Sequence, residues 1–82
     1  MNETPWNGTP AEMESTLGQR MKKSLILSGN GIGDLSQYLE VHRNSIASYL
    51  ADRMQPAPMI LRLWADKTGV PLAWLTAGSQ LD

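Results

Sequence analysis

Glycine and proline divide this chain into short segments, and their placement limits what the chain can fold into. The dividing residues are Gly29-Asn30-Gly31, Gln55-Pro56-Ala57-Pro58, Gly69 and Gly78. Glycine and asparagine close helices because they tolerate the left-handed backbone conformation, and proline suits the first helical turn because its missing amide hydrogen is not needed there. The segments between these glycines and prolines are therefore expected to be helices.

The spacing of apolar residues supports a helix in each segment. Met13, Leu17, Met21 and Leu25 fall four residues apart, on one face of a helix over residues 11–28 that we expect Thr4 or Thr9 to cap. Four further helices are predicted, over residues 32–39, from 42 or 43 to 51, over 58–68 and over 71–77. The predicted core consists of the apolar residues on their inner faces: Leu35, Leu39, Val41, Ile46, Tyr49, Leu50, Leu61, Trp64, Ala65, Trp74 and Leu75.

Length and composition favour one small intracellular domain. The 82 residues suffice for a single core, which we expect over residues 11–78, between a mobile tail at 1–10 and a short tail at 79–82. There is no cysteine, so disulfides and thiolate zinc sites are excluded. The apolar run at residues 25–27 is far shorter than the roughly 20 residues of a membrane span. A soluble, cytoplasmic protein is expected.

Residues 31–53 have the layout of a helix-turn-helix DNA reader. Two short predicted helices are joined by a tight turn at Glu40-Val41, and the second helix has a polar outer face. The residues on that outer face are Arg43, Asn44, Ala47, Ser48 and Ala51.

The surrounding residues resemble a known family, the lambda-repressor-like, Cro-type phage repressor domain. The resemblance extends over residues 17–78 and follows the family pattern L-A-x-x-L-G-V-S-R-x-x-I-S, then a proline, L-x-x-I-A-x-x-L-G-V and W-L-x-x-G. It implies a compact all-α domain of five helices, a phage or prophage transcriptional regulator that places its third helix in the major groove, often as a dimer on a palindromic operator. The matching residues are Leu35, Ser36, Leu39 to Arg43, Ile46, Pro58, Leu61, Trp64, Ala65, Gly69, Val70, Trp74, Leu75 and Gly78.

Four positions depart from the family pattern. Glu40 replaces the turn glycine, so it either tolerates a positive φ or the chain turns differently. His42 replaces the usual Ser or Thr cap, and Ser36 replaces an alanine packed between the two helices. Ile32 stands where some relatives carry a glutamine that contacts phosphate.

The outer face of the third helix supplies the candidate base contacts. Arg43 can bind O6 and N7 of a guanine through two hydrogen bonds, or it is a phosphate contact or a solvated arginine. Asn44 can pair with adenine or brace a phosphate, and Ser48 can reach a base or a backbone oxygen. Ala47 lies between them. The alternative for Asn44 and Ser48 is ordinary polar helix surface.

Candidate phosphate contacts flank this face. His42 is either a phosphate donor or an imperfect helix cap, and Arg53 and Gln55 resemble family positions beside the sugar-phosphate backbone. Tyr49, like Tyr38, is either a phosphate donor or part of the core edge. The cations earlier in the chain are expected to form a solvated face: Arg20, Lys22 and Lys23.

The charge distribution limits how strongly the chain can bind DNA. Residues 1–16 carry three glutamates and no Lys or Arg, whereas residues 17–67 carry all seven Lys and Arg residues against four Asp and Glu. With a net charge of -1, nonspecific binding should be weak, and affinity should depend on a dimer or on base contacts.

Other functions find less support in the sequence. No catalytic constellation surrounds His42, the only histidine, and the glycine-rich residues 29–33 match neither a dinucleotide fingerprint nor a phosphate-binding loop. We therefore expect no enzyme, cofactor, metal or small-molecule ligand. The rival hypothesis is a helical protein-interaction module, such as an antitoxin or antirepressor. The chain either forms a homodimer through its last helix, around Trp74-Leu75, or is the DNA-binding part of something longer.

Overall fold

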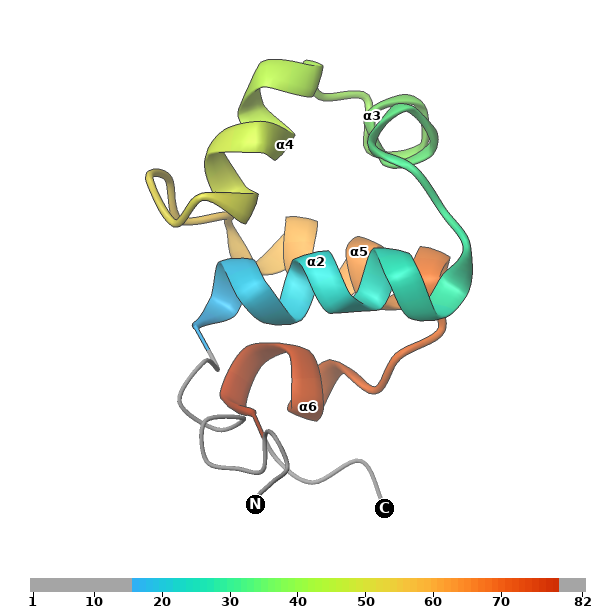
Figure 1. The fold of residues 1–82 in the computed structure, drawn as a ribbon, viewed down its shortest axis with the longest axis vertical. Coiled ribbons are helices and arrows are strands. Elements are labelled where there is room, and N and C mark those ends of the chain that lie inside the picture. The colour runs from blue at the N-terminus through green and yellow to red at the C-terminus, as the bar shows by residue number, and fades with distance from the viewer. Residues whose placement is uncertain (1–15, 79–82) are drawn as a thin grey trace, which may run out of the picture.

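The computed structural model of the chain describes residues 16–78 and is all-α in this part. Figure 1 shows α2 across the middle of the molecule, α3 and α4 on one side of it and α6 on the other. Within the described residues there are five helices and no strand: α2 (Leu17–Ser28), α3 (Ile32–Leu39), α4 (Arg43–Leu50), α5 (Pro58–Thr68) and α6 (Leu72–Ala77).

The helix bounds agree with the sequence predictions to within one residue, except at the start of α2. Thr16 is extended, with φ -78° and ψ 160°, and its side chain accepts a hydrogen bond from the backbone N–H of Gln19, 3.1 Å away. The prediction of a continuous helix over residues 11–28 is therefore wrong at Thr16, because Thr16 is the extended N-cap residue that precedes the first turn of α2. Met13 and the predicted caps Thr4 and Thr9 lie outside the described residues.

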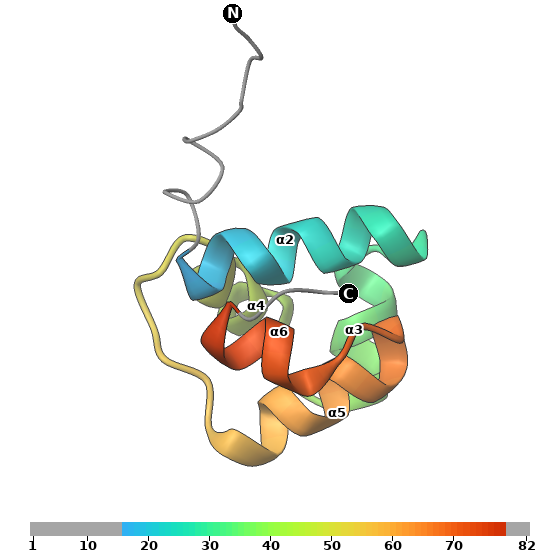
Figure 2. The same cartoon turned by 90° about the horizontal axis from the view of Figure 1, so that it is seen from below.

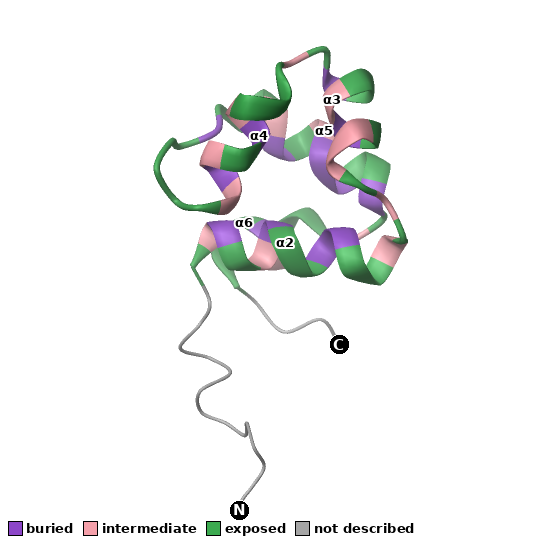
Figure 3. Ribbon diagram, turned by 45° about the horizontal axis from the view of Figure 1, so that its top comes forward, coloured by how far each residue is buried: buried purple, intermediate pink, exposed green. Residues whose placement is uncertain are grey.

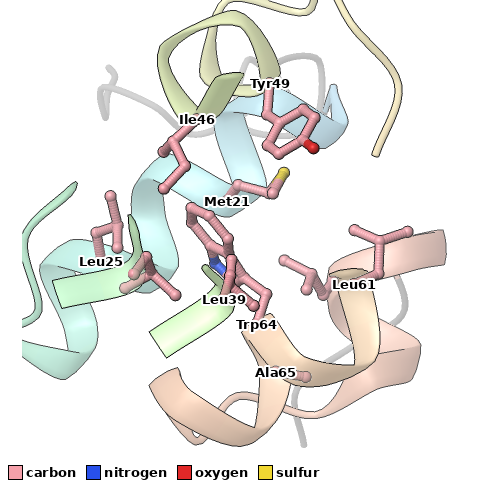
Figure 4. Packing of buried hydrophobic residues seen from close by; sticks show 10 residues of the cluster. Met21, Leu25, Leu39, Ile46, Tyr49, Leu61, Trp64 and Ala65 are labelled. Atoms are coloured by element: carbon pink, nitrogen blue, oxygen red, sulfur yellow. The ribbon is translucent and has the colours of Figure 1, made fainter. Parts of the chain in front are cut away.

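Ten buried apolar side chains form the core, as the spacing predicts. Figure 4 shows Trp64 near its centre, with side chains from α2, α3 and α4 around it. Leu75 is fully buried, so it is not available for the dimer contact expected at Trp74-Leu75. Trp74, Val41 and Leu50 are only partly buried against this cluster. The core members are Met21, Leu25, Leu35, Leu39, Ile46, Tyr49, Leu61, Trp64, Ala65 and Leu75.

Ser24 is a fully buried polar residue in α2 that accepts the hydrogen bond of the Trp64 indole N–H. Trp64 Nε1 donates to Ser24 Oγ at 2.7 Å, and Ser24 Oγ in turn donates to the carbonyl of Met21. Both side chains have zero exposure, so no solvent replaces this bond. The bond therefore ties α2 to α5 inside the core.

A glycine allows the end of α4 to pack directly on the first turn of α2. A Cβ at Gly18 would lie 2.5 Å from the carbonyl oxygen of Leu50 and 2.8 Å from that of Tyr49. The Gly18 N–H, which has no partner inside α2, donates to Asp52 Oδ1 at 2.8 Å. The carboxylate also lies at the helix end where negative charge is favoured.

Arg20 joins α2 to the end of α6, contrary to the prediction that it belongs to a solvated face. Its Nε donates to the carbonyl of Leu75 at 2.8 Å, and one terminal nitrogen donates to that of Thr76 at 3.1 Å. These carbonyls belong to the last turn of α6, where a cation is favoured. Figure 2 shows α6 beside α2 from a second direction.

Replacing Ser24 by alanine should destabilise the domain by about 1 to 3 kcal/mol, because the buried indole N–H of Trp64 loses its acceptor. Denaturant unfolding followed by tryptophan fluorescence or circular dichroism measures this change. The unfolding of Trp64→Phe, which removes the indole N–H donor, is followed by circular dichroism. In the Trp64→Phe background Ser24→Ala should cost clearly less, and an equal cost in both backgrounds would contradict the role assigned to this bond.

Replacing Gly18 by alanine should destabilise the domain by more than about 2 kcal/mol, because two backbone carbonyls must move to admit the new Cβ. Gly31→Ala is the matched control, since a Cβ there meets only Asp34 Oδ2, at 3.7 Å. The control should change the free energy of unfolding by less than about 1 kcal/mol. Equal losses in the two variants would show that close packing at Gly18 is not the cause.

Candidate functional site

The turn between α3 and α4 comprises Glu40, Val41 and His42, and Ser36 holds it closed. Val41 N–H donates to the carbonyl of Ser36 at 3.2 Å, and Ser36 Oγ donates back to the carbonyl of Val41 at 2.7 Å. Figure 1 shows α3 end on while α4 is seen from the side, so the two helices cross steeply. Sequence reasoning treated Ser36 only as a departure from alanine and missed this role.

Glu40 adopts the left-handed conformation, with φ 58° and ψ 42°. Of the two alternatives that the sequence left open, the first therefore holds: the chain turns as a glycine would allow, and Glu40 carries the strain. Its backbone N–H donates to the carbonyl of Ser36, which closes α3. Its side chain is exposed, so nothing buried compensates the strained backbone.

His42 caps α4, as one of its two predicted roles requires. Its Nδ1 accepts a hydrogen bond from the backbone N–H of Asn44 at 3.0 Å. An accepting Nδ1 carries a lone pair, so the proton of the neutral imidazole resides on Nε2. The exposed His42 side chain thus combines the cap with a donor at the start of α4.

Three of the four predicted base-contacting residues share the exposed side of α4. Arg43, Asn44 and Ala47 are exposed, and Ser48 is half-buried at the edge of this group. Figure 3 shows α4 at the border of the molecule with exposed positions on its outer side. No hydrogen bond or ion pair joins the Arg43 side chain to any of residues 16–78. Its five N–H donors are therefore available to a ligand.

Arg53 and Gln55 lie at the opposite end of α4 from His42. Both are exposed, in the loop that leads from α4 to α5. The loop is anchored where it begins, because Arg53 N–H donates to the carbonyl of Ser48 at 2.8 Å. The buried Pro56 anchors it again before α5. The structure thus brings predicted phosphate contacts to both ends of α4.

Tyr49 lies apart from these residues. It is 7% exposed and belongs to the core cluster, where Figure 4 shows its ring above Met21. Of its two predicted roles, Tyr49 therefore has the one in the core, and its buried ring is not placed to contact a phosphate. Tyr38, by contrast, is 46% exposed, and Lys67 Nζ lies 5.4 Å from the centre of its ring, a cation–π contact.

Replacing Glu40 by glycine should raise the free energy of unfolding by about 0.5 to 1 kcal/mol, because the left-handed conformation costs glycine no steric strain. Glu40→Ala removes the same charge but keeps a Cβ, and it should give little of this gain. Denaturant unfolding of the two variants measures the difference. An equal gain from alanine would assign the effect to the charge of Glu40.

Further observations on residues 16–78 concern metals and membranes. No group of three or more His, Asp and Glu side chains in this part of the chain is placed to hold a metal ion. No helix there has both the length and the apolar character that crossing a membrane requires.

Comparisons of the chain with protein-family models, with curated protein sequences and with solved structures give no match. The resemblance to the lambda-repressor-like family therefore stays a prediction. The fold class established for residues 16–78 is an all-α domain of five helices.

Proposed function

We propose that the chain is a sequence-specific DNA-binding transcriptional regulator of the phage or prophage Cro/repressor-like kind, which places α4 in the major groove of double-stranded DNA. The observation that carries this proposal is the exposed face of Arg43, Asn44 and Ala47 on a short helix held against α3 by a three-residue turn. An α-helix fits the major groove, where each base pair presents a distinct pattern of donors and acceptors. The protein acts in the cytoplasm of a bacterial cell or infected host.

Each residue of this face has chemistry suited to a base edge. The unengaged guanidinium of Arg43 matches the paired acceptors O6 and N7 of guanine. Asn44 matches N6 and N7 of adenine, and the methyl group of Ala47 suits the methyl group of thymine. Ser48, at the half-buried edge, reaches a base or a backbone oxygen.

Phosphate contacts are proposed at the two ends of α4. The Nε2–H of His42 lies at its start, and Arg53 and Gln55 follow its end, so donors are present on both sides of the base-reading face. Such contacts fix the register of a protein on the duplex without reading its sequence. The small positive excess over residues 17–67 adds only weak nonspecific attraction.

A homodimer on a palindromic operator completes the proposal. Because Leu75 is buried, pairing through α6 would use exposed positions of that helix such as Leu72, which is 38% exposed. Two copies of α4 bound to one operator give a higher affinity for DNA than a single short helix can provide.

A mobility-shift titration on duplexes from the protein's own gene neighbourhood, at two salt concentrations, tests the proposal. Binding should be detectable at micromolar protein and should weaken as salt rises. Absence of any salt-sensitive shift would reject DNA binding and favour the helical protein-interaction module.

Replacing Arg43 by alanine should reduce the preference for the operator over random DNA by about 5- to 150-fold, the worth of one bidentate guanine contact. Affinity for random DNA should fall much less. Arg62→Ala removes the same charge from α5, also at an exposed position, and should leave the preference unchanged. Equal losses on operator and random DNA would identify Arg43 as a phosphate contact instead.

A further inference from the structure

The guanidinium of Arg43 lies against α3 at Gly33. A Cβ built on Gly33 would be 2.8 Å from one terminal nitrogen of Arg43, 3.5 Å from Cζ and 4.0 Å from Nε. The first distance is shorter than such atoms ever approach, so the guanidinium occupies the space that any other residue at position 33 would fill. Since Arg43 has no hydrogen-bond or ion-pair partner within residues 16–78, this contact is one of packing alone.

The backbone does not explain a glycine at this position. Gly33 lies in the first turn of α3, and it is not among the glycines of residues 16–78 with positive φ, which are Gly29, Gly69 and Gly78. Within a helix, glycine is less favourable than alanine because it loses more backbone freedom on folding. What the missing side chain provides here is room for Arg43.

We infer that Gly33 is a positioning residue for Arg43 and thereby determines how strongly the protein prefers its DNA sequence; this inference rests on the proposed DNA-binding function. Packing against α3 limits the swing of a long side chain while leaving its donors free. A guanidinium held in this way loses less freedom when it meets the two acceptors of a guanine. A methyl group at position 33 displaces the guanidinium and removes this advantage.

The contact itself is tested on the free full-length chain by the Nε–H resonance of Arg43 in nitrogen-15 NMR, which requires no DNA. Gly33→Ala should shift this resonance and speed its exchange with water. Gly31→Ala, where the added Cβ meets only Asp34 Oδ2, should leave it unchanged. An unchanged Arg43 resonance in Gly33→Ala would overturn the inference. The melting temperature of Gly33→Ala should be no lower than that of the wild type, since alanine favours the helix.

The consequence for recognition is tested by selection from a pool of duplexes of about 30 base pairs, roughly three helical turns, with a randomised centre. Gly33→Ala should reduce the wild type's preference for its selected duplex over the random pool by about fivefold or more. In an Arg43→Ala background the same substitution should have no effect on preference.

Two results would overturn the role of Gly33: a Gly33→Ala protein with wild-type preference, or an equal loss with and without Arg43. A wild-type protein that selects no sequence would reject the proposed function and, with it, the role in specificity. That failure is distinguishable, because the NMR experiment reports on the contact between Gly33 and Arg43 whether or not the protein binds DNA.

Discussion

The burial of Trp64 is the constraint on which the rest of the domain depends. An indole can be fully buried only if its N–H finds an acceptor, and Ser24 supplies one from α2. The bond fixes how α2 and α5 lie against each other, and the side chains of α3 and α4 pack over the same ring. In so small a domain the whole margin of stability is a few kcal/mol, so the loss of this one arrangement affects every helix.

The orientation of α4 follows from attachments at both of its ends. At its start, Ser36 closes the turn from α3, and His42 caps the first helical turn. At its end, the close approach of Gly18 and the bond from its N–H to Asp52 hold the helix on α2. A helix of eight residues has little stability of its own. The direction in which its exposed face points is therefore set by the contacts at the two ends of the helix.

The sequence predicted the helices and the core well because both depend on local order. Proline and glycine mark the bounds of α5 at Pro58 and Gly69, and apolar spacing identifies the face that each helix buries. The exposed set of Arg43, Asn44 and Ala47 follows from the same periodicity. Periodicity assigns a face but not a partner, which is why Tyr49 was left open between the core and the surface.

The interactions that the sequence did not reveal are polar and distant along the chain. Ser24 meets Trp64 across 40 residues, and Arg20 meets the carbonyl of Leu75 across 55. Nothing near either residue in the sequence indicates such a partner, since an arginine or serine on a helix is ordinarily solvated. The contact between Arg43 and Gly33 is harder still to foresee, because it depends on Gly33 having no side chain, and a sequence gives no sign of which group occupies that space.

The bonds from Arg20 to the end of α6 also bring the two ends of the described domain together. Because α6 runs back along α2, the end of α6 lies near the start of α2, as both ribbon views show. A unit whose entry and exit points are neighbours can be inserted into a loop of another protein or circularly permuted with a short linker. Residues 16–78 meet this geometric requirement, and the end of α4 packs on the first turn of α2 beside the junction.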